Sequence, residues 1–154
     1  MANVSDEQAR RKPAPDRWSI AEVLEHLSHS EEHCYRARLE RMLTMDNPEI
    51  EVYDTGGFNA TGVYANPDPE ESFAHWEERR EDNLEFLRKL EPSALARIGS
   101  HARWGEITIE DLLNEWACHD LGHVRQIAEL VRVVVYYPAM GPFQGAYPGL
   151  RISS

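Results

Sequence analysis

The sequence is poor in cysteine, in positive charge and in long apolar runs. Its two cysteines, Cys34 and Cys118, stand far apart in a chain of 154 residues, which argues against a disulfide-stabilised scaffold. We expect both thiols to be reduced and buried in a cytoplasmic protein. The longest apolar run, 133–137, falls far short of the roughly 20 residues that span a bilayer. Residues 1–11 are polar and contain no apolar run, so we expect no signal peptide.

The shortage of positive charge limits the kinds of partner that we expect. The formal net charge is -11, from 16 lysine and arginine residues against 27 aspartate and glutamate residues. Nucleic acids and anionic membrane surfaces attract clustered positive charge, so we expect neither as a partner. A small molecule remains as the expected substrate or ligand.

What the sequence does contain is helical periodicity with start and stop signals. Ser19 and Glu22 fit a capping box, Asp68 precedes Pro69 at a helix start, and Thr108 precedes acidic residues. Prolines follow each of the three long helices, at Pro48, Pro92 and Pro138. Three long helices are therefore predicted, at 19–45, 68–91 and 108–137, after a short one at 5–11.

The chain length favours one domain, 1–154, with a polar N-terminal segment at 1–16 and an irregular C-terminal tail at 138–154. The fold class that follows is all-α, an up-down helix bundle. Between the first two long helices, residues 48–67 are rich in glycine and proline. Such a long connection is unusual in a compact domain and is often functional. Its aromatic residues, among them Tyr53 and Tyr64, predict that it packs onto the body of the protein.

Two histidines on the third long helix are the strongest functional signal. His119 and His123 are four residues apart, so both imidazoles lie on one side of the helix, within its apolar seam. Buried imidazoles need partners for their ring nitrogens, and one divalent metal ion satisfies both. The alternative is a pair of structural histidines bonded to neighbouring helices. Asp120 replaces the glutamate of the H-E-x-x-H pattern, which argues against a thermolysin-like protease.

A third metal ligand has to come from another part of the chain. On the first long helix, His26 lies at the border of the apolar face, whereas His29 and His33 lie further toward solvent. His26 is therefore the best placed of these three, although periodicity alone makes it a boundary residue. His101, in the connection before the third long helix, is a weaker candidate.

The order of these motifs resembles the DinB/YfiT-like superfamily of metal-dependent enzymes. The matching segments are W-S-x-x-E-V-x-x-H-L at 18–27 and H-D-x-x-H-x-x-Q-I at 119–127. The resemblance implies a four-helix bundle, often dimeric, with His26, His119 and His123 as ligands of Zn²⁺, Ni²⁺ or a similar divalent ion. It also implies hydrolysis or thiol S-transfer with a low-molecular-weight thiol, and a homodimer as the expected assembly.

One departure from the family pattern concerns the first bundle helix. Only about a dozen residues precede Pro13, too few for a helix that matches the other three. We expect either a truncated start or a groove that a neighbouring subunit or the C-terminal tail covers.

Three functional hypotheses follow from these residues. The leading one is a metal-dependent hydrolase or thiol S-transferase, and the others are a non-catalytic metal- or ligand-binding bundle in a stress response and a purely structural bundle. Asp120 and Glu22 are candidates for contacts that orient the histidines. An apolar pocket rimmed by Trp116, Tyr53 and Tyr64 fits the first two hypotheses, with segment 48–67 either a lid over the metal site or a simple connection.

Overall fold

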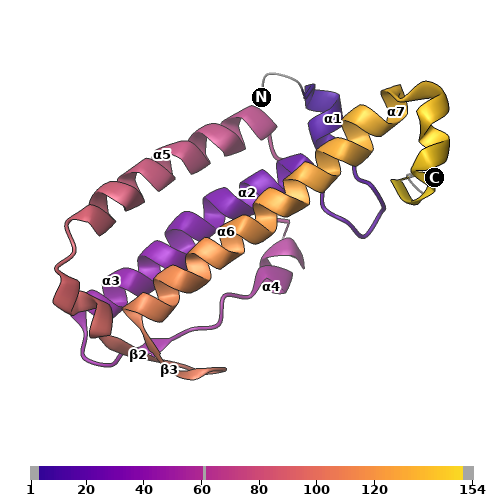
Figure 1. Cartoon of the computed structure of the whole chain (residues 1–154). Coiled ribbons are helices and arrows are strands. Elements are labelled where there is room, and N and C mark those ends of the chain that lie inside the picture. Colours follow the sequence, from indigo (N-terminus) through magenta and orange to yellow (C-terminus); the bar gives the residue numbers. More distant parts are fainter. Residues whose placement is uncertain (1–3, 61, 151–154) are drawn as a thin grey trace.

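The computed structural model describes residues 4–60 and 62–150 and is mostly helical. Three long helical segments lie side by side, with a short N-terminal helix at one end and a small sheet at the other (Figure 1). The segments are α2 (Ile20–Ser30) continued by a π-helical turn and α3 (Ala37–Thr44), then α5 (Pro69–Arg88), then α6 (Ile109–Val131) continued by a second π-helical turn and α7 (Tyr137–Ala139). The three long helices and the short α1 (Asp6–Arg10) are thus confirmed.

The helices begin where the sequence signals place them. Ser19 and Glu22 form a reciprocal capping box at the start of α2, and Thr108 and Asp111 form another at α6. The Asp68 side chain accepts hydrogen bonds from the first backbone N–H groups of α5. These contacts satisfy backbone donors that have no partner inside a helix.

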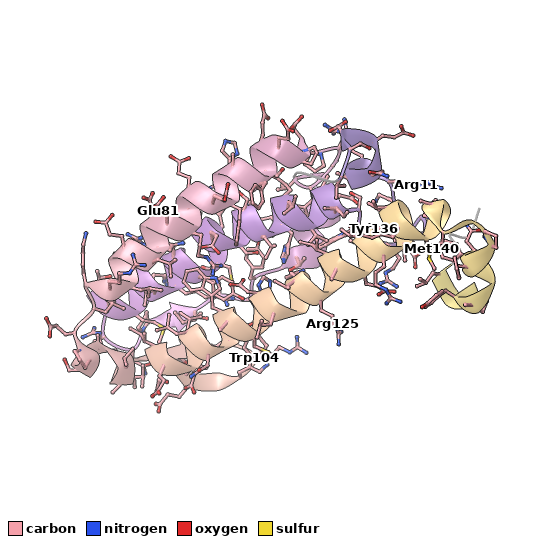
Figure 2. The ribbon with its side chains drawn as sticks, turned by 45° about the horizontal axis from the view of Figure 1, so that its top comes forward. Arg11, Glu81, Trp104, Arg125, Tyr136 and Met140 are labelled. Carbon is pink, nitrogen blue, oxygen red and sulfur yellow. The ribbon has the colours of Figure 1, made fainter. Side chains whose placement is uncertain are left out.

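A three-stranded sheet corrects the all-α expectation. Strand β1 (Glu49–Ile50) pairs in parallel with β2 (Ile98–His101), which pairs antiparallel with β3 (Gly105–Thr108). Gly99 allows β1 and the first long helix to pack closely against β2, because a Cβ at position 99 would lie 2.9 Å from Ile50 Cγ1. Trp104, at the tip of the β2–β3 hairpin, is 60% exposed (Figure 2). The sheet covers the end of the helices where α3 and α6 meet.

The connection at 48–67 is also more regular than expected. It contains β1 and the short helix α4 (Thr55–Ala60). Its aromatic residues pack onto the body as predicted: Tyr64 is fully buried, and Tyr53 and Phe58 are half-buried. Up to residue 150, the tail after α7 forms two short 3₁₀ turns, Gly141–Ala146 and Pro148–Leu150, rather than irregular chain; residues 151–154 of the predicted tail lie outside the described residues.

Two apolar clusters hold the long helices together. One contains Tyr35, Leu39, Ile109, Leu112 and Trp116 near the sheet. The other contains Ile20, Leu24, Leu27, Leu130 and Val134 at the opposite end. On α6 the residues between Trp116 and Leu130 include both histidines of the 119–123 pair, so a polar site lies between two apolar cores.

Helices α5 and α6 leave a groove of about 450 Å³ between them. Its walls are mainly apolar, with Leu84, Leu87, Leu113, Trp116, Ala117 and Leu121. The cover predicted for such a groove, by a neighbouring subunit or the C-terminal tail, and the homodimer stay predictions. Among the described residues, no helix is both long and apolar enough to cross a membrane.

Candidate metal centre

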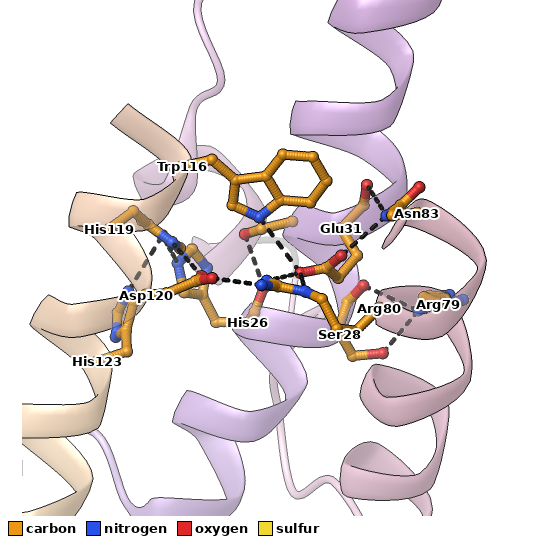
Figure 3. A network of polar contacts seen from close by, with 11 residues as sticks. His26, Ser28, Glu31, Arg79, Arg80, Asn83, Trp116, His119, Asp120 and His123 are labelled. Carbon is orange, nitrogen blue, oxygen red and sulfur yellow. Dashed lines mark hydrogen bonds and ion pairs between the residues drawn. The ribbon is translucent and has the colours of Figure 1, made fainter. Parts of the chain in front are cut away.

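Three histidines from two helices converge on one point between the apolar clusters. His26 comes from the middle of α2, and His119 and His123 come from successive turns of α6 (Figure 3). The Nε2 atom of His119 lies 3.1 Å from that of His26 and 3.2 Å from that of His123. The helical spacing brings the α6 pair together, whereas only packing of α2 against α6 brings in His26. His26 is 3% exposed, so it is a core residue and not a boundary residue.

The other ring nitrogen of each histidine faces an oxygen atom. His123 Nδ1 lies 2.8 Å from Gln126 Oε1, and His26 Nδ1 lies 3.4 Å from the Tyr64 hydroxyl. His119 Nδ1 lies 3.6 Å from Asp120 Oδ1, slightly beyond hydrogen-bond distance. Neither of these two buried atoms has a hydrogen-bond partner among the described residues. Oxygen partners of this kind favour a proton on Nδ1, which leaves the Nε2 lone pairs turned toward one another.

This arrangement fits a divalent metal ion. Nitrogens bound to one Zn²⁺ at about 2.0–2.1 Å in tetrahedral geometry lie about 3.3 Å apart, close to the 3.1 and 3.2 Å separations observed. Lone pairs that face one another at this distance repel unless a cation lies between them. Within the described chain, these three residues form the group whose ligand atoms lie within 4.8 Å of one another.

The surroundings of His26 and His123 favour neutral imidazole, the state in which histidine binds metal. Burial and, after it, the nearby His123 and His119 together lower the pKa of His26 to about 3. Burial also lowers the pKa of His123, with His119 adding to the effect. Burial alone raises the pKa of Asp120, but its contacts with His119 and Arg80 hold it below the usual value. Asp120 therefore stays ionised beside His119.

The lowered pKa of His26 predicts that the metal-free protein is sensitive to acid. The unfolded imidazole takes up a proton near pH 6.5, whereas the folded one does so near pH 3. Between these values the unfolded state binds more protons, so the free energy of unfolding falls as the pH decreases. We expect His26 to account for a loss of about 2 kcal/mol between pH 7 and pH 5, measured by urea denaturation of chelator-treated protein.

A matched pair of variants isolates this effect. His26→Gln should reduce the dependence of unfolding free energy on pH, whereas His75→Gln, at an exposed position of α5, should retain it. An equal pH dependence in wild type and His26→Gln would contradict the assignment.

Next to the histidines lies a buried polar network that the sequence analysis missed. Glu31, 1% exposed, accepts hydrogen bonds from Arg80 Nε at 3.0 Å, Asn83 Nδ2 at 2.8 Å and Trp116 Nε1 at 3.3 Å. Arg80 Nη1 in turn contacts Asp120 Oδ2 at 2.7 Å. Contacts thus run from His119 through Asp120 and Arg80 to Glu31 (Figure 3). The available signal was a carboxylate at 31 on the apolar stripe of residues 24, 27 and 34.

Segment 48–67 supplies a second group of polar contacts. The Tyr53 hydroxyl lies 3.0 Å from that of Tyr64 and 2.5 Å from His29 Nδ1. The prediction that His29 lies toward solvent is therefore wrong, because the segment packs over it. His33 is exposed, as expected. The lid function of this segment stays a prediction.

Glu22 and Trp116 make contacts other than those predicted from the sequence. The Glu22 carboxylate bonds to the Ser19 backbone N–H at 2.8 Å and to Lys12 Nζ at 2.7 Å, so it belongs to the helix cap. Trp116 stacks on Tyr35 and lines the groove between α5 and α6, whereas Tyr64 contacts His26. Of the three residues predicted to rim one pocket, Tyr53 and Tyr64 contact each other, whereas Trp116 lines the groove between α5 and α6.

The remaining candidates lie outside the three-histidine group. His101 is buried in β2 and stacks on Trp104. Both cysteines are free, and Cys34 is a core residue as expected. Cys118 is exposed, which corrects the expectation of a buried thiol, because its side chain projects from α6 away from the apolar seam.

Comparisons with known proteins identify a family and a similar fold. A family model described as the DinB superfamily matches residues 1–127. YfiT from Bacillus subtilis has a similar structure, with a TM-score of 0.73 and 26% sequence identity over 86% of this chain and 75% of the YfiT chain. YfiT is described as a probable metal-dependent hydrolase with an unusual four-helix bundle topology. No curated protein sequence matches the chain.

Proposed function

The chain belongs to the DinB superfamily, and from this premise we propose that it is a metal-dependent enzyme whose divalent ion is held by His26, His119 and His123. The observation that carries the proposal is the convergence of three Nε2 atoms at 3.1 and 3.2 Å. The match to the family model is the second support, because it confirms the resemblance that the spaced motifs indicate.

A divalent ion with three neutral ligands would supply Lewis acidity toward water or an incoming thiol. The zinc ion is the first candidate and nickel the second, since imidazole suits both. The residues around the ligands hold them in place. Gln126 fixes the ring of His123, Tyr64 that of His26, and Asp120 that of His119. Ordered rings of this kind reduce the conformational entropy that metal binding costs.

We propose hydrolysis as the reaction, because a similar structure is described as a probable metal-dependent hydrolase. Attack by a low-molecular-weight thiol is the second candidate. The same metal ion would bind an incoming thiol as its thiolate. The chain's own exposed thiol, Cys118, lies outside the histidine group, so the thiol would be a separate molecule. A cytoplasmic location and a homodimer complete the proposal.

The metal site is tested by elemental analysis of protein purified without a histidine tag. We expect close to one divalent ion per chain, and a Co²⁺-substituted sample should show the strong visible absorption of a low-coordinate site. Metal well below one equivalent after incubation with Zn²⁺ or Ni²⁺ would contradict the proposal.

The reaction is tested by turnover of the metal-loaded protein. We expect hydrolysis of a chromogenic ester or amide that chelator treatment abolishes and added metal restores. If the protein turns over an electrophile only when a thiol is added, the proposed activity changes from hydrolase to thiol transferase. A metal-loaded protein without turnover of either kind would support the non-catalytic binding alternative.

A further inference from the structure

A cavity of about 670 Å³ lies beside the histidines, at the C-terminal end of the molecule. The loop between α1 and α2, the second half of α6 and the C-terminal turns form its walls, and these three segments lie close together in Figure 1. Apolar side chains of the walls are Pro13, Trp18, Leu130, Val133 and Leu150. A cavity of this size is large enough for a small molecule.

Two arginines give this cavity a positive charge on a strongly acidic protein. Arg17 comes from the loop and Arg125 from α6, and Arg125 projects from the side of α6 away from α5 (Figure 2). Within residues 4–60 and 62–150, neither guanidinium forms an ion pair or a side-chain hydrogen bond. With 27 acidic side chains in the chain, two unpaired arginines on one cavity leave an excess of positive charge there.

The one acidic side chain of the cavity wall does not cancel this charge. Glu129 lines the cavity, but its carboxylate is engaged in an ion pair with Arg132. Guanidinium groups bind carboxylates and phosphates through paired hydrogen bonds, which gives both charge and geometry. The free donors of Arg17 and Arg125 therefore suit a small anion.

The cavity and the histidines share parts of their walls. Trp18 lines the cavity and packs on His26, with 5.0 Å between the ring centroids. Gln126 lines it and holds His123 Nδ1 at 2.8 Å, and Gly122 lies directly before that histidine. A molecule in the cavity thus lies next to residues that contact two of the three ligands.

We propose that this cavity is the substrate pocket and that it selects a small organic anion, whose carboxylate or phosphate group is bound by Arg17 and Arg125. Calling the bound anion a substrate rests on the proposed function, because it requires a reaction at the histidines. The anion site itself needs only the two arginines and the apolar walls. The substrate then combines one anionic group with an apolar part that contacts Trp18 and Leu130.

The test measures binding to chelator-treated protein by calorimetry, so that no metal ion contributes to anion affinity. The probes are phenylacetate, phenyl phosphate and the neutral phenylacetamide. We expect one or both anions to bind at least about tenfold more tightly than the amide, and the difference to shrink at high salt. The stronger of the two anions identifies the headgroup as carboxylate or phosphate.

Three single variants and one double variant show which residues cause the preference for anions. Arg17→Gln and Arg125→Gln should each weaken anion binding about fivefold or more and leave amide binding unchanged. Arg88→Gln, which removes the same charge from an exposed position of α5, should leave both unchanged. Wild-type protein without a preference for anions, or a preference that survives in the Arg17→Gln/Arg125→Gln double variant, would overturn the proposal.

The result is independent of the metal measurement. If the protein prefers anions through these arginines but binds no metal ion, the anion site is supported and the proposed function is contradicted. If the protein binds metal and hydrolyses a neutral ester but shows no preference for anions, the proposed function is supported and the assignment of this pocket is contradicted. Circular dichroism of each variant confirms that the comparison is made on folded protein.

Discussion

Replacing His119 by alanine is expected to lower metal affinity by more than about 100-fold and to abolish turnover. Loss of a residue that only orients a ligand already costs about 10–100-fold in affinity or activity, and His119 is itself a proposed ligand. Its Nε2 atom lies 3.1 Å from that of His26 and 3.2 Å from that of His123. Competition with a chelator of known affinity measures the change in metal binding, and the ester or amide assay measures turnover.

His75→Ala is the matched control for His119→Ala. His75 is exposed on α5, so its loss should change neither metal affinity nor turnover. The metal-free His119→Ala protein should remain folded, because it loses one of several mutually repelling lone pairs and, from the core clusters, the edge-on ring contact with Tyr35. Stoichiometric metal in His119→Ala at wild-type affinity would refute the three-histidine assignment.

The second large effect is expected on stability, from Arg80→Met. This change removes the charge that neutralises Glu31, which is 1% exposed and held by Arg80, Asn83 and Trp116. Removing one partner of a buried ion pair typically costs about 3–5 kcal/mol, because it leaves an unpaired charge in the interior. We expect a decrease of that size in the free energy of unfolding, measured by urea denaturation at pH 7.

A double variant distinguishes lost charge balance from lost packing. Arg80→Met/Glu31→Gln removes both charges, and the amide at 31 can still bond to Asn83 and Trp116, so most of the lost stability should return. Arg88→Met, on the exposed face of the same helix, should change the free energy of unfolding by less than about 0.5 kcal/mol. An Arg80→Met loss below about 1 kcal/mol would contradict the buried network.

Arg80→Met also probes the connection from this network to the histidines. Arg80 Nη1 holds Asp120 Oδ2 at 2.7 Å, and the other oxygen of Asp120 faces His119 Nδ1. Without the arginine, Asp120 loses its only ion-pair partner besides the histidine among the described residues. The network therefore fixes the orientation of Asp120 toward His119.

The helices could be predicted because their signals are local. Capping residues such as Ser19, Asp68 and Thr108 act on backbone groups within a few residues, and apolar periodicity reports the buried face of each helix. The sheet was not predictable in the same way. Strand β1 has two residues, and β2 and β3 have four each. Segments this short carry little periodicity, and their pairing depends on chain segments far apart in the sequence.

For the candidate site, the sequence alone determined that His119 and His123 form a pair on the apolar seam of one helix. The spacing of four residues fixes this through helix geometry. The motif resemblance added His26, whose border position on the helix wheel left its burial undecided.

Tertiary structure decided what lies around that pair. Packing of α2 against α6 brings His26 Nε2 to 3.1 Å from His119 Nε2, and segment 48–67 places Tyr64 against His26 and Tyr53 against His29. Helix packing also brings Arg80 of α5 into contact with Glu31 and Asp120, which lie on two other helices. Contacts between distant segments depend on how whole helices pack and not on local spacing, which is why the sequence by itself did not reveal them.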